Sequence, residues 1–438
     1  MTAFSVTPKA PAGGRLQVPG DKSISHRALL LGAIAEGTTT ISGFLAGEDC
    51  LATLAALQAM GAQIKRPEPT AVVVEGVGLR GLQAPAGALD MGNSGTAMRL
   101  FAGLLAGQAF DTELTGDESL LRRPMGRVAK PLAQMGASIT TVNNRPPLSI
   151  RGNQSLQGID YPMPVASAQV KSALLLAGLY AGGETCVHEP APTRDHTERM
   201  LTQFGVTVNR TEDRICLASG QTLQADAIAV PGDLSSAAFF LLAGCLALPG
   251  GVLQIDGVGL NPTRTGILQI LQLMGADIQV EQQVGKTPYA EPVGRLTVRP
   301  SRLRGIQVPP ALVPLAIDEF PLVFVAAALA DGETLISGAE ELRHKESDRI
   351  SVMLDGLRAL SVKVEERPDG ALITGGVLGG GEVDSCGDHR VAMAFAIGAS
   401  VAEGPVTILD TANVATSFPG FARQAQDIGI SLRVNTDE

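Results

Sequence analysis

The sequence predicts an α/β protein with two domains, in which apolar helices are enclosed by sheets. A chain of 438 residues is too long for one ordinary core, so more than one domain is expected. One segment plan recurs six times along the chain. The motif Val-Pro-Gly-Asp at residues 18–21 also returns at residues 230–233, which divides the repeats into two sets of three.

Each repeated segment starts with polar or charged residues, continues as an Ala- and Leu-rich helix, and ends after a Gly turn in a short β-branched strand. These helices have almost no polar face, so each needs apolar neighbours on most sides. Three of them packed together would satisfy that need, with the strands forming sheets outside. The segments span residues 22–43, 93–116, 167–189, 233–257, 318–338 and 388–409.

A second kind of helix lies between these segments. It is amphipathic, so we expect it nearer the surface. It usually ends in Gly, which fits the left-handed position after a helix, and then runs into a strand. The six examples span residues 51–64, 125–139, 196–208, 265–278, 349–364 and 421–432.

The two kinds of helix combine into a repeated unit of alternating strands and helices, with three units in each domain. We place residues 20–234 in the first domain and residues 1–19 with 235–438 in the second. The chain then crosses between domains near residues 19–21 and 231–235. The first strand, at about residues 14–18, belongs to the second domain in this scheme.

Composition excludes several classes of function. The chain has 34 Lys and Arg against 44 Asp and Glu, which argues against a general nucleic-acid binder but permits a local basic cleft. It has no Trp and 3 Tyr, too few aromatic side chains for a base-stacking platform. The longest apolar run, residues 237–249, is too short to span a bilayer, and residues 1–8 lack a signal or transit pattern.

Motifs for metals and common cofactors are not found in the sequence. The five cysteines are scattered without C-x-x-C, so we expect no disulfide framework, no zinc site and a cytoplasmic location. The five histidines have no metal-ligand spacing. Residues 76–81 match G-x-G-x-x-G, but no helix-like stretch follows, so we interpret them as a turn.

The polar starts of the six apolar helices indicate an anion-binding site. Any one start also fits an ordinary helix cap. Parallel helices would bring the six starts to the gap between the domains, where free N–H groups and basic side chains attract an anion. Lys-Ser at 22–23, Gln-Val-Lys at 169–171 and His-Arg at 389–390 recur at equivalent places, which favours the shared site.

Two stretches supply candidate acid–base groups. Lys345 and Glu346, followed by Arg349, could hold an anion beside a carboxylate, although such a charged stretch also suits a solvated helix start. Asp318 lies inside an apolar run, where a carboxylate is costly unless it is paired or functional. We favour a functional role for Asp318 over a buried cap.

These residues belong to motifs through which nearly the whole chain resembles the 5-enolpyruvylshikimate-3-phosphate (EPSP) synthase family. The forms Ser-Ala-Gln-Val-Lys, Arg-Asp-His-Thr-Glu and Asn-Pro-Thr-Arg resemble the second class of that family. The matching stretches are Gly-Asp-Lys-Ser-Ile-Ser-His-Arg (20–27), Gly-Asn-Ser-Gly-Thr (92–96), Arg-Pro-Met-Gly-Arg (123–127), Ser-Ala-Gln-Val-Lys (167–171), Arg-Asp-His-Thr-Glu (194–198), Asn-Pro-Thr-Arg (261–264), Lys-Glu-Ser-Asp-Arg (345–349) and Asp-His-Arg (388–390).

The resemblance implies a fold, a reaction and partners. The fold is a two-domain inside-out α/β barrel of six βαβαββ units, with the active site in the cleft between domains. The reaction moves the enolpyruvyl group of phosphoenolpyruvate onto the 5-hydroxyl of shikimate 3-phosphate by addition and elimination, releasing phosphate. It needs no metal or other cofactor. We expect a monomer that binds neither nucleic acid nor membrane.

The resemblance also assigns site residues. It implies that Asp318 takes the 5-hydroxyl proton, Glu346 exchanges a proton with the phosphoenolpyruvate methylene, and Lys22 assists the departing phosphate. The residues expected to hold phosphoenolpyruvate are Lys22, Asn93, Gly95, Arg123, Gln169, Arg349 and Arg390. Those expected to hold shikimate 3-phosphate are Lys22, Ser23, Arg27, Ser167, Ala168, Gln169, Arg194, Asp318 and Lys345.

The chain departs from the family pattern at one place, and the resemblance also predicts an inhibitor. Many first-class members have Lys before a Thr-Phe-Pro near the C-terminus, whereas this chain has Ala415, so we assign no ligand there. In this family, Ala at the position of Gly95 crowds glyphosate while admitting phosphoenolpyruvate. Gly95 leaves that space open, so we expect glyphosate to compete with phosphoenolpyruvate.

Two alternatives remain at this point. One is the enolpyruvyl transferase that acts on UDP-N-acetylglucosamine, which shares the fold but has a reactive Cys in a mobile loop. The corresponding residues 116–124 contain no Cys. The other is a catalytically silent anion-binding protein, and the intact set of Lys22, Asp318 and Glu346 argues against it.

Overall fold

The computed structural model describes residues 2–283, 285, 287 and 289–436. Contacts between Cα atoms divide these residues into two compact units. The terminal unit contains residues 2–19, 231–283 and 292–436, and the middle unit contains residues 20–230. A short segment that includes Glu291 also belongs to the middle unit, although we had predicted residues 235–438 to lie wholly in the other domain.

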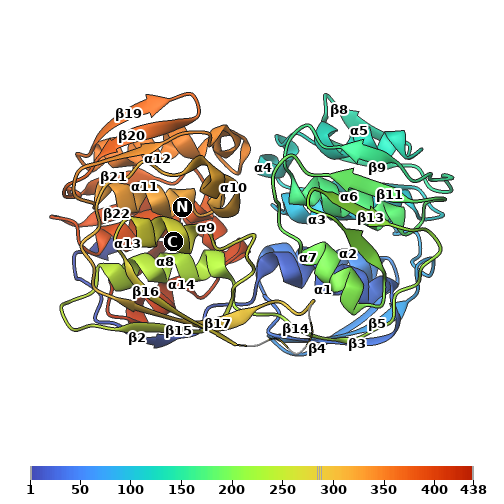
Figure 1. Ribbon diagram of the computed structural model, residues 1–438, viewed down its shortest axis with the longest axis horizontal. Coiled ribbons are helices and arrows are strands. Elements are labelled where there is room, and N and C mark those ends of the chain that lie inside the picture. Colours follow the sequence, from blue (N-terminus) through green and yellow to red (C-terminus); the bar gives the residue numbers. More distant parts are fainter. Residues whose placement is uncertain (1, 284, 286, 288, 437–438) are drawn as a thin grey trace. The chain divides into compact units, whose positions relative to one another are not determined.

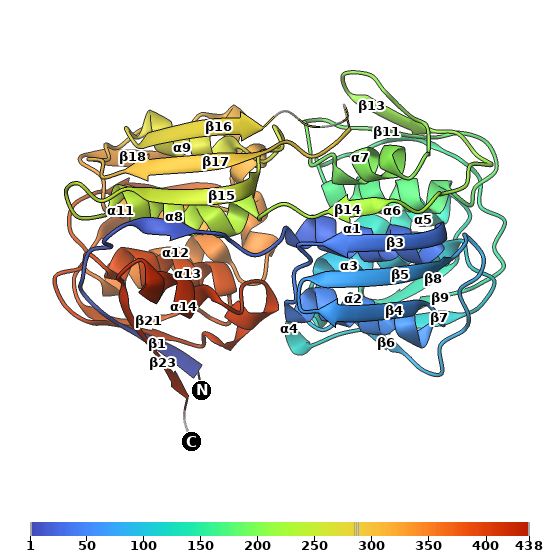
Figure 2. The same ribbon diagram turned by 90° about the horizontal axis from the view of Figure 1, so that it is seen from below.

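The middle unit contains three four-stranded sheets. Their strand orders are β14-β3-β5-β4, β6-β7-β9-β8 and β10-β11-β13-β12, and Figure 2 shows β3, β5 and β4 side by side. The first pair in each sheet is parallel and the other two pairs are antiparallel. The strands are β3 (Glu36–Ser42), β4 (Gln63–Glu68), β5 (Ala71–Val77), β6 (Leu89–Asp90), β7 (Thr112–Thr115), β8 (Ile139–Val142), β9 (Arg145–Ile150), β10 (Asp160–Pro162), β11 (Thr185–His188), β12 (Val208–Arg210), β13 (Arg214–Leu217) and β14 (Ala227–Ala229).

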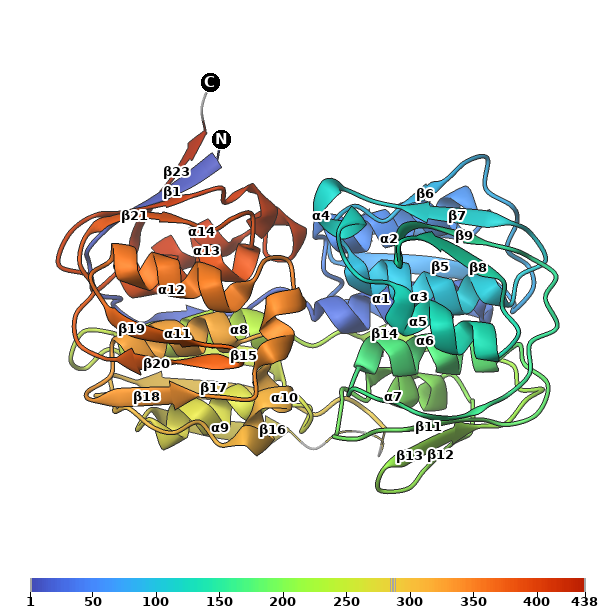
Figure 3. The ribbon, with the colours of Figure 1, turned by 90° about the horizontal axis from the view of Figure 1, so that it is seen from above.

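The terminal unit uses the same sheet plan. Its orders are β2-β15-β17-β16, β18-β20-β19 and β21-β22-β1-β23, and Figure 3 shows β18, β20 and β19 together. In the three-stranded sheet, Gln307 forms an isolated parallel bridge with Leu335 at the place of the fourth strand. The strands are β1 (Thr2–Thr7), β2 (Gly14–Leu16), β15 (Leu253–Gly259), β16 (Asp277–Gln283), β17 (Val293–Arg299), β18 (Glu333–Ile336), β19 (Lys363–Arg367), β20 (Gly370–Thr374), β21 (Gly381–Asp384), β22 (Val406–Leu409) and β23 (Ser431–Thr436).

The predicted apolar helices are confirmed. In the middle unit α3 contacts both α1 and α6, and in the terminal unit α13 contacts both α8 and α11 (Figure 1). All twelve residues of α8 and all nine of α11 are buried, as helices without a polar face require. The six helices are α1 (Lys22–Ile34), α3 (Gly95–Ala106), α6 (Ala168–Gly178), α8 (Leu234–Cys245), α11 (Phe320–Ala328) and α13 (His389–Ala399).

The amphipathic helices are also confirmed, and five of them are followed by a glycine with positive φ, which lies between 86° and 99°. The exception follows α12, where Ser361 has φ 66°. These helices are α2 (Glu48–Ala59), α5 (Gly126–Gln134), α7 (His196–Gln203), α9 (Gly266–Leu273), α12 (Arg349–Ala359) and α14 (Phe421–Asp427). Short helices complete the chain: α4 (Glu118–Leu121), α10 (Val313–Ala316), η1 (Pro310–Leu312), η2 (Glu340–His344) and η3 (Ala412–Thr416).

Two features of the chain were not predicted. Strand β1 lies between β22 and β23 and pairs with β23 from Thr2↔Thr436 to Thr7↔Ser431. Its buried residues include Phe4 and Val6, so an alternating pattern was present but short. The expectation of no disulfide is wrong, because Cys186 and Cys216 lie opposite each other on β11 and β13 and are bonded. Strand register, rather than sequence spacing, brings these two sulfurs together.

Two exclusions made from sequence agree with the structure. Residues 78–81, after β5, form a turn, and no helix begins between this turn and α3. The G-x-G-x-x-G stretch is therefore not a dinucleotide fingerprint, which requires a helix directly after the glycines. Over the residues that the structure describes, no helix combines the length and apolar character needed to cross a membrane.

The positive φ of Ser361 yields a stability prediction. Changing Ser361→Gly should raise the free energy of unfolding of the terminal unit by about 0.5–1 kcal/mol, because relief of left-handed strain exceeds the added entropy of the unfolded chain. Gly275→Ala, in the same unit and at φ 99°, should lower it by a similar amount. Urea unfolding monitored by circular dichroism measures both. Unfolding midpoints that move in the same direction for the two variants would contradict the argument.

Candidate active site

Five of the six apolar helices begin with a side chain that caps the helix. In each, an Asp or Ser oxygen accepts a hydrogen bond from a backbone N–H of the first turn. The capping interpretation is therefore correct for these five residues, and cationic side chains lie close to several of them. The capping residues are Asp21, Ser94, Ser167, Asp233 and Asp388.

In the terminal unit, four of the predicted site residues come together. Asp318 lies between α10 and α11, with its Oδ1 3.4 Å from Lys345 Nζ and 3.6 Å from Arg349 Nη1. Glu346 accepts from Arg349 Nη2 at 2.6 Å. The side chains of Asp318 and Glu346 keep 17% and 19% of their surface exposed. Two partly exposed carboxylates therefore lie beside two cations.

The fully buried carboxylate of Asp388 holds Arg349 in place. Its Nε donates to Asp388 Oδ2 at 2.8 Å, and the Asp388 side chain has no exposed surface. Burial acts to lower the pKa of Arg349, but the charges of Asp388, Glu346 and Asp318 outweigh it and raise that pKa. Burial likewise acts to raise the pKa of Asp388, and Arg349 reverses this and lowers it. Both groups therefore remain charged at neutral pH.

Arg390 joins the same cluster from the start of α13. Its Nη1 donates to the backbone oxygen of Asp318 at 3.1 Å and lies 3.7 Å from Glu319 Oε1. Glu319 is buried and also accepts a short hydrogen bond from Ser235. Arg264 Nη2, from the Asn-Pro-Thr-Arg stretch, donates to Asp233 Oδ1 at 2.9 Å and lies 3.9 Å from Glu319. The starts of α8, α11 and α13 are thus linked through charged side chains.

In the middle unit, the predicted residues form a second cluster. Lys22, the first residue of α1, donates from Nζ to Asp49 Oδ2 at 3.0 Å. Arg123 donates from Nη2 to Asn93 Oδ1 at 2.9 Å. The Asn93 amide in turn donates to Asp117 Oδ2 at 2.6 Å. These contacts orient two cations near the starts of α1 and α3.

Gly95 lies directly against two guanidinium groups. A Cβ at this position would be 2.9 Å from Arg99 Nη1 and 3.0 Å from Arg123 Nη1, closer than real Cβ contacts normally come. Gln169, near the start of α6, accepts from Arg99 Nη1 at 2.6 Å and donates to Thr96 Oγ1 at 2.9 Å. Sequence analysis missed Arg99, although it lies one helical turn after Gly95 and therefore on the same face of α3.

Arg27 makes extensive internal contacts. It donates to Thr197 Oγ1 at 2.6 Å, to Ser172 Oγ at 2.8 Å and to the backbone oxygen of Ser23 at 2.8 Å. Burial lowers its pKa to about 10, and nearby Arg194 acts in the same direction. Arg27 thus orders the interior between α1, α6 and α7, and Arg194 lies close enough to affect its charge.

His26 is the buried neighbour of this cluster. Its Nδ1 is 2.8 Å from Thr53 Oγ1 and its Nε2 is 3.3 Å from Ser94 Oγ. Burial first, and then the charges of Lys22 and Arg27, hold the pKa of His26 well below 6.5. His26 is therefore neutral at physiological pH and serves as a hydrogen-bonding spacer between α1, α2 and α3.

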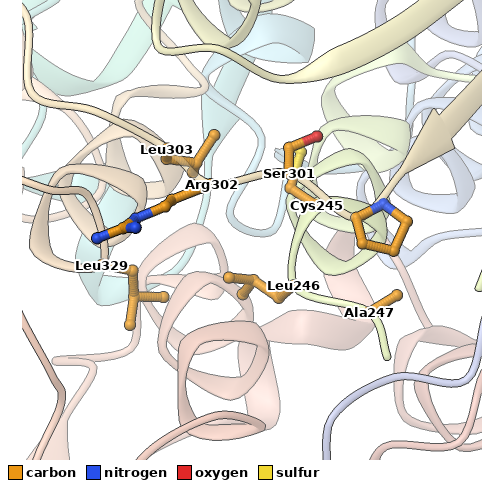
Figure 4. A pocket seen from close by; sticks show the side chains of 8 residues that line it. Cys245, Leu246, Ala247, Ser301, Arg302, Leu303 and Leu329 are labelled. Atoms are coloured by element: carbon orange, nitrogen blue, oxygen red, sulfur yellow. The ribbon is translucent and has the colours of Figure 1, made fainter. Parts of the chain in front are cut away.

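Two other places in the structure are less suited to catalysis. A hollow of about 450 Å³ in the terminal unit is lined by Cys245, Arg302 and mostly apolar side chains near the last turn of α8 (Figure 4). Burial raises the pKa of Cys245 to about 12, so its thiol is a poor nucleophile. Asp195, His196 and Glu291 come together in the middle unit, but Asp195 already pairs with two arginines.

The clusters differ in chemistry. The middle cluster offers helix starts, cations and amide groups, which suit phosphate and carboxylate oxygens. The terminal cluster adds carboxylates beside cations, which suit proton transfer next to a bound anion. Two α/β units of one sheet plan with these groups at their helix starts are typical of an enzyme that acts on polyanionic small molecules.

The chain belongs to the EPSP synthase family. The sequence profile described as EPSP synthase (3-phosphoshikimate 1-carboxyvinyltransferase) matches residues 6–424. A 3-phosphoshikimate 1-carboxyvinyltransferase of Acidithiobacillus ferrooxidans is 59% identical over 436 residues, covering 99% of both chains. One from Alkalilimnicola ehrlichii is 60% identical over 433 residues, covering 98% of this chain and 96% of that protein.

Solved structures agree with this assignment. The EPSP synthase of Acinetobacter baumannii, at 49% identity, has a TM-score of 0.89 and covers all of both chains. A second structure of EPSP synthase from that organism has a TM-score of 0.87 at 49% identity and covers 99% of this chain and all of that one. These matches confirm the predicted two-domain α/β class and favour this family over the UDP-N-acetylglucosamine transferase and the silent protein considered from sequence.

The buried neutral His26 leads to a prediction about pH. Below about pH 6.5 the unfolded chain binds a proton at this residue that the folded chain does not, so stability falls as pH falls. The loss should reach up to about 1.4 kcal/mol per pH unit. Urea unfolding at pH 7, 6 and 5 should show a flatter pH dependence for His26→Gln than for wild type. His344→Gln, at an exposed histidine, should leave the slope unchanged; parallel curves for wild type and His26→Gln would refute the assignment.

Proposed function

We propose that this chain transfers the enolpyruvyl group of phosphoenolpyruvate to the 5-hydroxyl of shikimate 3-phosphate, and that the two clusters together form its active site. Membership of the family supports the reaction. The observation that carries the site is the meeting of Asp318, Lys345, Glu346 and Arg349 in one unit. Release of phosphate from phosphoenolpyruvate, dependent on shikimate 3-phosphate, tests the whole proposal.

The proposed architecture is an inside-out barrel of three βαβαββ units in each domain. The sheet plan shared by both units supports it. The proposed domain limits are those expected from sequence, except for the short segment that includes Glu291, with crossings near residues 19–21 and 231–235. We also propose a monomer in the cytoplasm, where two phosphorylated, membrane-impermeant substrates are retained.

Phosphoenolpyruvate binds the groups that suit a phosphate and a carboxylate together. In this proposal Lys22, Arg123, Arg349 and Arg390 supply positive charge to those oxygens. The amides of Asn93 and Gln169 direct their hydrogen-bonding atoms toward Arg123 and Arg99 and so fix the guanidinium planes. Gly95, which has no side chain, lets the Arg99 and Arg123 guanidinium groups approach the start of α3.

Shikimate 3-phosphate binds at the starts of α1 and α6 and at two charged loops. Ser167 and Ala168 offer the N-terminal end of α6, whose partial positive charge favours phosphate. The remaining proposed contacts come from residues already assigned to the ligand: Lys22, Ser23, Arg27, Gln169, Arg194, Asp318 and Lys345. Arg27 contributes chiefly by ordering the interior, since three of its donors already have partners inside the protein.

Two carboxylates, Asp318 and Glu346, carry out the proton transfers in this proposal. In the addition step, the 5-hydroxyl oxygen bonds to C2 of phosphoenolpyruvate while its proton passes to Asp318, and Glu346 delivers a proton to the C3 methylene. In the elimination step, Glu346 takes a proton back from C3, the bond from C2 to the phosphate oxygen breaks, and Lys22 stabilises the departing phosphate. Lys345 and Arg349 contact Asp318 Oδ1 and hold this carboxylate in position.

Replacing Glu346 by glutamine, its amide, tests the role of this residue. Glu346→Gln keeps the hydrogen-bond acceptor for Arg349 but removes the transferable proton. We expect kcat to fall by about 10²–10⁴-fold with little change in ligand affinity. Steady-state assays of phosphate release, with binding measured by calorimetry, separate the two quantities. Glu340→Gln, at a nearby exposed glutamate, is the control, and a wild-type kcat in Glu346→Gln would remove this residue from the chemistry.

The space at Gly95 is tested with glyphosate. We propose that glyphosate competes with phosphoenolpyruvate in the wild type and that Gly95→Ala weakens glyphosate by about tenfold or more, equivalent to about 1.4 kcal/mol. The KM for phosphoenolpyruvate should change less, because the added methyl group crowds the larger ligand first. Gly87→Ala, where a new Cβ meets nothing within 4 Å, is the matched control. Strong inhibition that is no weaker in Gly95→Ala would defeat the steric argument.

A further inference from the structure

Lys171 is a fully buried cation that the proposed chemistry does not use. It is the fourth residue of α6, and its side chain has no exposed surface. Its Nζ lies 2.9 Å from Glu189 Oε1 and 2.6 Å from Glu198 Oε1, whose side chains are 2% and 7% exposed. A buried lysine between two carboxylates carries a large desolvation cost. Such an arrangement therefore needs a reason beyond packing.

The two carboxylates stand at the ends of the segment that presents Arg194. Glu189 directly follows β11, and its backbone N–H donates to Asp213 O at 2.8 Å. Glu198 lies in the first turn of α7. Between them, Thr193 donates a short hydrogen bond from Oγ1 to Glu189 Oε1. By binding both glutamates, Lys171 closes the segment from 189 to 198 and fixes it to α6.

Hydrogen bonds around the triad of Lys171, Glu189 and Glu198 extend this connection to α1. Ser172, the next residue of α6, lies 2.7 Å from Thr197 Oγ1, and Arg27 donates to both hydroxyls. Burial lowers the pKa of Arg27, and the charge of Glu198 acts against that fall. Lys171, Arg27, Glu189 and Glu198 thus form two buried cations balanced by two buried anions. Removing one member changes the charge balance at three helices.

We propose that Lys171, with Glu189 and Glu198, positions Arg194 against the start of α6 for binding of shikimate 3-phosphate. The inference rests on the proposed function of Ser167, Ala168 and Arg194. It also explains why the Lys of Ser-Ala-Gln-Val-Lys and the Glu of Arg-Asp-His-Thr-Glu occur in one chain: they are the two halves of one ion pair. Lys171 and Glu198 touch no substrate and act by fixing the distance between two substrate-binding elements.

The experiment compares affinity for the two substrates. Glu198→Gln keeps side-chain size and leaves Lys171 paired with Glu189, so the protein should fold. Freeing one end of the segment should raise the KM for shikimate 3-phosphate by about 10–100-fold, while kcat and the KM for phosphoenolpyruvate stay within about threefold. Glu212→Gln, at an exposed glutamate of the same unit, should leave all three constants unchanged.

Two further variants make the result decisive. Glu189→Gln frees the other end of the segment and should reproduce the selective rise in KM for shikimate 3-phosphate. Arg194→Ala tests the underlying site. If this variant leaves the KM for shikimate 3-phosphate unchanged, the proposed function of Arg194 fails. If the KM for shikimate 3-phosphate rises in Arg194→Ala but not in Glu198→Gln, only the positioning role is overturned. Equal rises in both KM values, or loss of folded protein in both glutamine variants, would identify the triad as a folding element and also overturn the proposal.

Discussion

The structure depends on neutralising charges that are buried at the starts of apolar helices. A helix that is apolar all round has only its ends to offer to polar chemistry, and a cation placed there loses its hydration. Several of these cations have a carboxylate at ion-pair distance, as Arg390 has Glu319 and Lys22 has Asp49. Because these partners come from other helices or loops, the pairing also restricts which elements can be neighbours. Removing one partner alone would leave an uncompensated buried charge, which costs several kcal/mol.

Exposure separates the carboxylates that hold the structure from those available to a substrate. The side chains of Asp388 and Glu319 are 0% and 2% exposed, and both are occupied by arginines. Asp318 and Glu346 share some of the same arginines but retain 17% and 19% of their surface. The same cation can therefore stay fixed by one carboxylate while it supports the acid–base chemistry of another. This arrangement supplies a preorganised electrostatic environment without requiring the arginine to move.

The elements that sequence predicted well are those with a local and repeated signal. The apolar helices, the amphipathic helices and their C-terminal glycines follow from periodicity and composition, and family motifs selected the site residues. Partners that come from distant positions were missed, because no local pattern indicates that Lys171 meets Glu198 or that Arg99 meets Gln169. The Cys186–Cys216 bond was missed for the same reason, since strand register decides it. Sequence thus specified helix starts more completely than the ion pairs between them.

The position of β1 has a consequence for how the chain is made. This first strand pairs on one side with β22 and on the other with β23, at the far end of the sequence. A ribosome adding roughly 5–20 residues per second needs tens of seconds to make the intervening chain, and throughout that time β1 has neither neighbour. An unpaired strand with buried-type residues such as Phe4 and Val6 is prone to pair with other chains. The first strand is therefore open to such pairing until synthesis of the chain is almost complete.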